Sequence, residues 1–183
     1  MELYLIRHPK PDIASGICYG QTDLALLDSP QPDARRLKRQ LPKDFLLYSS
    51  PLQRARLLAE ALGQPRIDDR LMEINFGAWE MLEFSDIGAG INAWVQDPMH
   101  FRMPQGESLE DVAGRVNQWF DEQRVLFAEK PVVVVAHGGS LRVLAGRLLG
   151  IPSSRWLSLD FDYARLCRID SHEWGYMLKG FNL

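Results

Sequence analysis

Hydrophobic residues gather into short runs that alternate with amphipathic, helix-like segments along the chain. Apolar runs at 2–6, 45–48 and 132–135 are bounded by charged residues, proline or glycine, which predicts three buried strands. Helices are expected at 34–41, from the Ser50-Pro51 pair to Leu62, from Ser108 onward, and at 140–149. The β-branched run 132–135 is typical of a parallel strand covered on both faces. Together these elements predict a three-layer α/β/α sandwich with a mainly parallel central sheet.

The remaining segments are less regular. Residues 164–169 and 173–181 alternate in the manner of edge strands, and a turn is expected at Asp170-Ser171-His172. Residues 77–105 have weak periodicity and several glycine or proline breakers. Because the 183-residue chain contains neither a repeat nor a linker, we expect a single domain over 1–183 with a small lid insertion at about 82–103.

Composition and charge exclude several classes of protein. The chain has 21 Lys and Arg against 24 Asp and Glu, a formal charge of -3, which disfavours nucleic-acid and anionic-membrane partners. Cys18 and Cys167 are far apart in sequence and predict neither a disulfide framework nor a zinc site. Arg7 interrupts the first apolar run too early for a signal peptide, and the run 132–136 is too short to span a bilayer. A cytoplasmic location is therefore expected.

Polar residues follow the predicted strands at the positions where open α/β sheets bind ligands. These residues are Arg7-His8, the segment from Ser49 to Arg54, and His137-Gly138-Gly139. Arginine offers paired donors to phosphate, and a helix that starts with glycine amides stabilises an anion. No nearby Asp or Glu completes a ligand set with the two histidines, and the arginines would repel a cation. The pattern favours a phosphate-sized dianion, with no metal and no cofactor.

Five motifs occur in an order that resembles the histidine phosphatase superfamily, also called phosphoglycerate mutase-like. Each motif is weak alone, but the ordered set covers nearly the whole chain and is specific. The motifs are Leu5-Ile6-Arg7-His8, Ser49-Ser50-Pro51-Leu52-Gln53-Arg54-Ala55, Glu73-Ile74-Asn75-Phe76-Gly77-Ala78-Trp79-Glu80, Gly106-Glu107-Ser108 and Val135-Ala136-His137-Gly138-Gly139.

This resemblance implies a catalytic role for each matching residue. His8 matches the nucleophile that becomes a phosphohistidine, and Glu73 matches the general acid that protonates the leaving oxygen and then activates water. Glu80 and Glu107 are also carboxylates within motifs and stay open as alternatives for the acid. The groups expected around the phosphate are Arg7, Arg54, His137 and the amide of Gly138.

Three features depart from the family pattern. Pro9 stands where glycine usually follows the Arg-His pair, and proline has no N–H to donate to a bound oxygen. Met81 stands where glycine usually follows the Trp-Glu pair. No residue between Pro9 and Tyr19 matches the asparagine with which many relatives contact phosphate. Pro9 puts the orientation of His8 in question, and Met81 affects the angle at which the chain enters the expected lid.

The loop 18–26, Cys-Tyr-Gly-Gln-Thr-Asp-Leu-Ala-Leu, resembles the α-ribazole phosphatase branch of the superfamily. That resemblance implies removal of the 5′-phosphate from α-ribazole 5′-phosphate, or from adenosylcobalamin 5′-phosphate, in cobalamin biosynthesis. Tyr19 is a candidate substrate-binding residue, and Trp79, Trp94 and Phe101 could stack on an aromatic base. The alternatives are a broad-specificity small-molecule phosphatase, a phosphoglycerate mutase and a non-catalytic phosphate-binding relative. The oligomeric state stays open.

Overall fold

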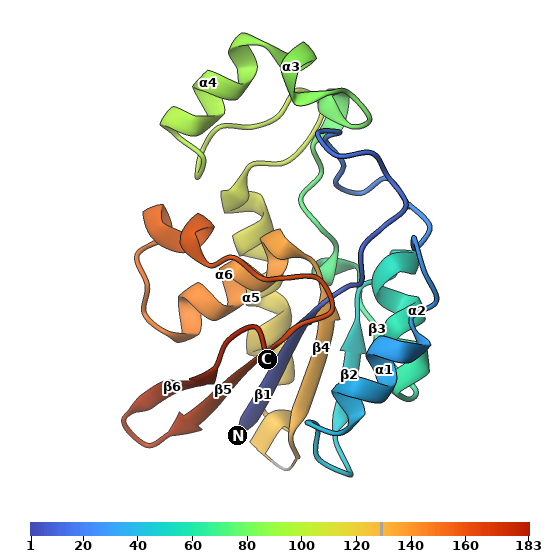
Figure 1. Cartoon of the computed structure of the whole chain (residues 1–183). Coiled ribbons are helices and arrows are strands. Elements are labelled where there is room, and N and C mark those ends of the chain that lie inside the picture. Colours follow the sequence, from blue (N-terminus) through green and yellow to red (C-terminus); the bar gives the residue numbers. More distant parts are fainter. Residues whose placement is uncertain (129) are drawn as a thin grey trace.

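Six strands form one mixed sheet in the computed structural model, which describes residues 1–128 and 130–183 (Figure 1). Four neighbouring strands are parallel, and the last two are antiparallel and lie at one edge. This arrangement confirms the predicted α/β class with a mainly parallel sheet. The spatial order is β3 (Arg66–Ile67), β2 (Leu46–Ser49), β4 (Val132–Ala136), β1 (Glu2–Arg7), β5 (Leu166–His172) and β6 (Gly175–Gly180).

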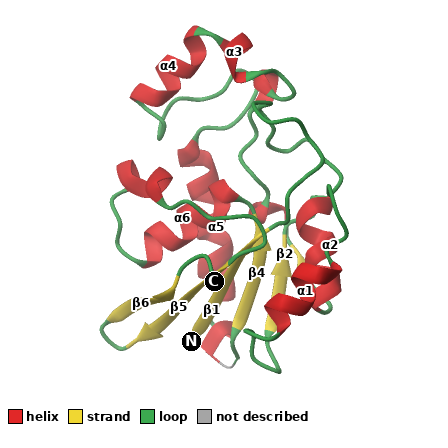
Figure 2. Ribbon diagram, in the orientation of Figure 1, coloured by secondary structure: helices red, strands yellow, loops and turns green. Residues whose placement is uncertain are grey.

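Helices cover both faces of the sheet and make the three layers (Figure 2). One face packs against α1 (Gln31–Lys38) and α2 (Gln53–Leu62), and the other packs against α5 (Leu109–Gln123) and α6 (Gly138–Leu148). Alternate residues of β1 point to opposite faces, so Leu5 joins the α5–α6 core and Ile6 joins the α1–α2 core. The strands are therefore held between two hydrophobic layers.

The segment that contains α3 (Phe84–Ile87) and α4 (Ala89–Gln96) lies beyond the carboxyl ends of the parallel strands, at the top of Figure 1. An isolated bridge between Ile17 and Glu83 joins its beginning to the N-terminal loop. Short 3-10 helices occur at Asp69–Leu71, Gly77–Trp79, Leu126–Ala128 and Ser153–Ser158. Across the described residues, no helix has the length and apolar character needed to cross a membrane.

The predicted start of the second helix is wrong. Ser50 and Pro51 do not cap that helix, which begins at Gln53 after Leu52 in an extended conformation. The chain continues from β2 in the direction of the strand, because the amide of Ser50 donates to the carbonyl oxygen of Val135 (3.1 Å). The Ser50 side chain is thereby placed at the end of the sheet and turned toward its neighbour strand.

Other boundaries also move. The expected helix at 34–41 starts at Gln31 because Pro32 fits the first turn of a helix, and α6 starts at Gly138, two residues before the predicted position. The predicted turn at residues 170–172 is wrong, because these residues are still paired with β6. The chain reverses at Glu173 and Trp174 instead, immediately before Gly175, whose φ of 140° suits glycine.

Candidate functional site

The carboxyl ends of β1, β4 and β2 bring three segments that are far apart in sequence to one place. Arg7 lies opposite Ala136 in the parallel register of β1 and β4, and Ser49 lies opposite Val135 in that of β2 and β4. The residues that follow, His8 and His137, have ring centroids 4.9 Å apart, and both side chains are buried. Two buried imidazoles thus share a small volume at the end of the sheet.

His8 is held in one tautomer. Its Nδ1 lies 2.6 Å from the carbonyl oxygen of Pro9, and a carbonyl only accepts, so Nδ1 carries the proton and donates. The Nε2 atom then keeps its lone pair. Burial, followed by the guanidinium of Arg54 and then that of Arg7, holds the pKa of His8 well below its ordinary value. Pro9 supplies a carbonyl here, so replacement of the usual glycine does not affect this contact.

His137 is the second buried imidazole. Its Nε2 lies 2.7 Å from Oγ of Ser50, the side chain that the sequence analysis had assigned to a helix cap. Burial lowers the pKa of His137 well below its ordinary value, and His8 and Arg54 add to the effect. Nδ1 of His137 is buried and has no hydrogen-bond partner in the part of the chain that the structure describes.

Two guanidinium groups border the histidines without being neutralised. Arg54 is fully buried and donates through its two Nη atoms to the carbonyl oxygens of Thr22 and Gly20. Arg7 donates to the carbonyl oxygen of Phe161 (2.6 Å), and its guanidinium carbon lies 3.9 Å from the ring centroid of Tyr163. Within the described residues, neither arginine forms an ion pair with a carboxylate, and each has a buried Nε without a partner. Such a site favours an anion.

Glu73 faces the start of α6. Its Oε1 and Oε2 atoms accept from the amide of Gly139 at 2.9 and 3.1 Å, and Oε1 also accepts from the amide of Ile74. The other two candidate acids have different contacts. Glu80 accepts from backbone amides of the 21–22 loop, and Glu107 forms a two-point ion pair with Arg115 at 2.9 and 3.0 Å. Of the three, Glu73 lies beside the glycine pair that follows His137.

Arg115 was not found by the sequence analysis. In addition to Glu107, it donates to three backbone carbonyl oxygens of the segment that leads to the acid, including that of Glu73 at 2.9 Å. Its position on α5, eight residues after Glu107, carries no local motif. Only the tertiary structure shows that it fixes the backbone of Glu73.

A cavity of about 110 Å³ opens beside the acid. Trp94 borders it, whereas Trp79 is buried and stacks on Phe101 with centroids 5.6 Å apart, so these two rings are already packed. Apart from Glu73, Gly139 and Arg142, the lining is apolar and consists of Ile74, Phe76, Trp94, Leu109 and Leu157. The cavity can therefore take an apolar or aromatic group next to the carboxyl group of Glu73.

The tyrosine predicted to bind substrate forms a bridge between two loops. Oη of Tyr19 lies 2.7 Å from Oη of Tyr163, and the guanidinium carbon of Arg54 lies 5.4 Å from the Tyr19 ring centroid. Tyr163, which the sequence analysis missed, also lies 5.6 Å from the His8 ring. Burial raises the pKa of Tyr19, and its hydrogen bond to Tyr163 adds to the effect. Through these two rings the tyrosine pair borders both arginines.

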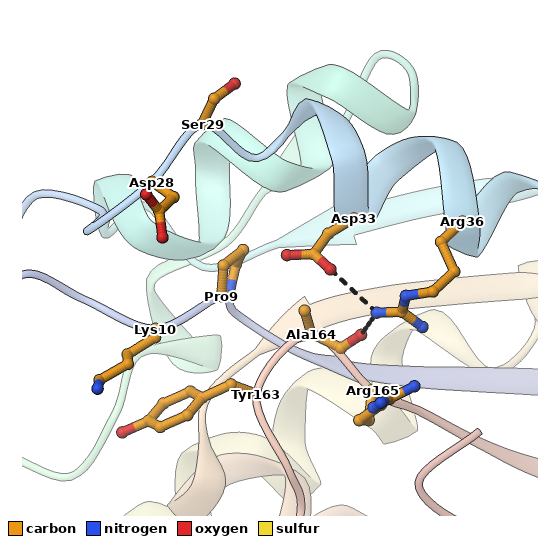
Figure 3. A pocket seen from close by; sticks show the side chains of 9 residues that line it. All are labelled: Pro9, Lys10, Asp28, Ser29, Asp33, Arg36, Tyr163, Ala164 and Arg165. Carbon is orange, nitrogen blue, oxygen red and sulfur yellow. Dashed lines mark hydrogen bonds and ion pairs between the residues drawn. The ribbon is translucent and has the colours of Figure 1, made fainter.

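A second cavity, of about 230 Å³, is bordered by Pro9 and Tyr163 (Figure 3). Arg36 crosses its edge, where it pairs with Asp33 at 3.1 Å and donates to the carbonyl oxygen of Ala164. Its lining has charges of both signs and does not include the two buried histidines. The cavity therefore adjoins the cluster around His8 through Pro9 and Tyr163, but the two histidines themselves do not line it.

Met81 adopts a left-handed backbone conformation with a φ of 68°. Glycine adopts this conformation freely, whereas a side chain at Cβ makes it costly. The departure from the family glycine is therefore tolerated at the price of backbone strain. Two backbone hydrogen bonds to Cys18, at 2.8 Å each, hold Met81 and Leu82 in place.

Comparison with known proteins places the chain in a family. The sequence model described as "Histidine phosphatase superfamily (branch 1)" matches residues 3–183. The chain belongs to the histidine phosphatase superfamily. This assignment confirms the resemblance seen in the five motifs.

Individual members of the superfamily resemble the chain over most of its length. It is 34% identical to glucosyl-3-phosphoglycerate phosphatase of Mycolicibacterium vanbaalenii, over 84% of this chain and 76% of the relative. It is 29% identical to phosphoserine phosphatase 1 of Hydrogenobacter thermophilus, over 94% and 88%. The solved structure of a putative α-ribazole-5′-P phosphatase from Escherichia coli superimposes with a TM-score of 0.90 at 26% identity, covering 100% of this chain and 96% of that one. The chain is a phosphatase of this superfamily.

In this histidine phosphatase the residues that match the superfamily motifs converge at one end of the sheet. His8, His137, Arg7 and Arg54 surround a common point, and Glu73 lies at the adjoining start of α6. Among residues 1–128 and 130–183, no three His, Cys, Asp or Glu side chains are grouped as metal ligands are.

Proposed function

We propose that the protein hydrolyses phosphate monoesters through a phosphohistidine at Nε2 of His8. The observation that carries this proposal is the buried, unprotonated Nε2 beside two guanidinium groups that have no carboxylate partner in the described chain. An imidazole with a free lone pair is the nucleophile that the reaction needs. The two arginines leave positive charge available for the oxygens of a phosphoryl group.

In the first step of the proposed reaction, Nε2 attacks phosphorus and the bond from phosphorus to the ester oxygen breaks. Glu73 gives its proton to that oxygen, so the alcohol leaves neutral. In the second step water attacks phosphorus, the N–P bond breaks, and Glu73 takes a proton from the water. Inorganic phosphate is released, and both His8 and Glu73 return to their starting states.

The rest of the cluster stabilises the transferring group. Arg7 and Arg54 neutralise charge on the equatorial oxygens, where phosphoryl transfer gains most from fixed electrostatics. His137 supplies a further contact, and its ring is oriented by Ser50. The amide of Gly138, at the first position of α6, faces an anion favourably because helix N-termini carry partial positive charge.

The proposed substrate is α-ribazole 5′-phosphate or its late cobamide counterpart. Support comes from the 18–26 loop and from the likeness to the solved structure of a putative α-ribazole-5′-P phosphatase from Escherichia coli. The apolar cavity beside Glu73 supports a leaving alcohol that carries an aromatic base, with Trp94 as the ring available to stack. Residues 82–103, which include α3 and α4, are the proposed lid over this side.

A broad-specificity small-molecule phosphatase is the second candidate. The relatives that resemble the chain have names that give different substrates, phosphoserine in one case and glucosyl-3-phosphoglycerate in another. Such variety within one fold favours a site that recognises the phosphate strongly and the alcohol weakly.

The first test is phosphate release, in the presence of a chelator, from α-ribazole 5′-phosphate, 3-phosphoglycerate and an aryl phosphate. His8→Ala serves as the blank. We expect rapid release from the ribazole ester that is absent in the variant, with a phosphohistidine trapped in the wild type. Slow and similar release from every ester would favour the broad-specificity candidate. No release from any ester, or loss of activity on chelation, would refute the proposed reaction.

The role of Trp94 has its own test. Trp94→Ala should raise KM for the ribazole ester by about tenfold, the equivalent of one stacked ring, while a small aryl phosphate is affected little. Trp174→Ala, which changes a largely exposed tryptophan on the far hairpin, is the matched control. Equal losses on both esters would contradict stacking by Trp94.

A further inference from the structure

We propose that Glu80 is a positioning residue that fixes the guanidinium of Arg54 through the loop of residues 20–22. This inference rests on the proposed role of Arg54 in binding phosphate. Glu80 does not touch the arginine in an ion pair. It binds amides of the loop whose carbonyl oxygens bind the arginine.

The carboxylate of Glu80 is a point of convergence for hydrogen-bond donors. Its Oε1 accepts from the amides of Gln21 (2.8 Å) and Phe76 (3.1 Å). Its Oε2 accepts from the amide of Thr22 (2.6 Å) and from the Thr22 hydroxyl. Burial raises the pKa of this carboxyl, but the bonds from Thr22, Gln21 and Phe76 outweigh that effect and lower it below the ordinary value. The anion is thus the form that the loop stabilises.

The same loop holds Arg54 from its other side. The carbonyl oxygens of Gly20 and Thr22 accept from the two Nη atoms of Arg54. The Gln21 N–H that Glu80 binds belongs to the same peptide unit as the Gly20 carbonyl, and the Thr22 N–H belongs to the next unit, which lies between the two carbonyls. A shift of the loop would therefore move both acceptors of the guanidinium together.

The loop has little freedom to adjust by other means. A Cβ atom on Gly20 would lie 2.1 Å from the carbonyl oxygen of Ile74 and 2.8 Å from Oε1 of Glu80. The backbone of residue 20 is thus in contact with the segment that carries Glu80. Two residues earlier in the chain, Cys18 pairs with Met81 and Leu82 through backbone hydrogen bonds.

The carboxylate of Glu80 binds amides of the loop and not Arg54, so the positive charge of the phosphate site is not cancelled by an ion pair. Buried arginines need acceptors, and direct pairing with Glu80 would cancel the charge that a dianion requires. Neutral carbonyls orient the guanidinium without neutralising it, and Glu80 in turn satisfies two backbone amides of the same loop. The arrangement separates orientation of Arg54 from neutralisation of its charge.

The experiment is a double-mutant cycle between Glu80→Gln and Arg54→Ala, with kcat, KM and competitive inhibition by inorganic phosphate as readouts. Glu80→Gln alone should lower kcat/KM by roughly 10- to 100-fold and weaken phosphate inhibition, because the loop loses its hydrogen bonds to a charged group. In the Arg54→Ala background the same change should lower kcat/KM by less than about threefold, because the guanidinium that Glu80 positions is then absent. Glu173→Gln, which changes an exposed carboxylate in the turn between β5 and β6, is the control.

A second variant covers the case in which Glu80→Gln does not fold. Thr22→Val removes only the hydroxyl bond to Glu80, and Thr22→Ser restores it. We expect Thr22→Val to weaken phosphate inhibition several-fold, and Thr22→Ser to recover it. An additive penalty in the cycle, or unchanged inhibition in Thr22→Val, would overturn the inference. Phosphate binding with no hydrolysis of any ester by the wild type would instead mark failure of the proposed function.

Discussion

Acid should destabilise this protein through its two buried histidines. Both His8 and His137 have a pKa well below the ordinary 6.5, first because burial disfavours the charged ring and then because Arg54 and the neighbouring ring add repulsion. Below pH 6.5 the unfolded chain binds a proton at each ring, while the folded protein keeps both rings neutral. The free energy of unfolding therefore falls as the pH drops below 6.5, and the fall continues down to the folded-state pKa values.

The magnitude follows from the difference in proton binding. The pH of 5.5 lies one unit below the ordinary pKa of 6.5. Between pH 7.5 and pH 5.5, each histidine that stays neutral when buried lowers the free energy of unfolding by about 1.4 kcal/mol, which is about 3 kcal/mol for the pair. That loss is a substantial part of the stability of a typical domain. Carboxylates also contribute to acid unfolding, so the histidine part must be isolated by substitution.

The measurement is urea unfolding at pH 7.5 and pH 5.5 for the wild type and for the His8→Asn and His137→Asn double variant. Asparagine cannot titrate in this range, so the stability lost between the two pH values should be smaller in the double variant by about 3 kcal/mol. His172→Asn, which changes an exposed histidine, is the control and should behave as the wild type. An equal loss in the wild type and the double variant would show that the two rings take up protons in the folded protein as they do in the unfolded chain, and would refute the lowering of their pKa by burial.

Three other outcomes can be measured. Glu73→Gln should lower kcat on an alkyl phosphate by about 10²- to 10⁴-fold and less on an aryl phosphate, whose leaving oxygen needs less protonation; equal losses would contradict a general acid. Ser50→Ala should lower kcat/KM by about threefold to tenfold through loss of the bond to His137, and Ser50→Thr, which keeps the hydroxyl, should recover part of the loss. Met81→Gly should raise the free energy of unfolding by about 0.5–1 kcal/mol, because relief of the left-handed strain exceeds the entropic cost of glycine. Leu82→Gly, at the next residue, should lower it, and urea titration of both variants checks the sign.

Much of the fold and of the candidate site could be predicted from the sequence, because these features depend on local patterns. The strands at 2–6 and 132–135 are short runs of apolar residues. Such a run is typical of a parallel strand that is buried on both faces of the sheet. The capping box of Ser108 and Asp111 marks the start of α5 by its own chemistry. His8 and His137 could be named because each directly follows such a strand, where open sheets bind ligands.

The tertiary structure alone decided the partners of those residues. Ser50 has the local features of a helix cap but contacts His137, because β2 lies next to β4 in the sheet. Arg115 and Glu80 carry no local sign of their contacts, since each binds a backbone segment that is far away in sequence. Local propensity determines where strands and helices occur, whereas hydrogen bonds between distant segments depend on how the sheet is ordered. The motifs therefore identified the groups that converge at the end of the sheet, and only the packed structure showed what holds them there.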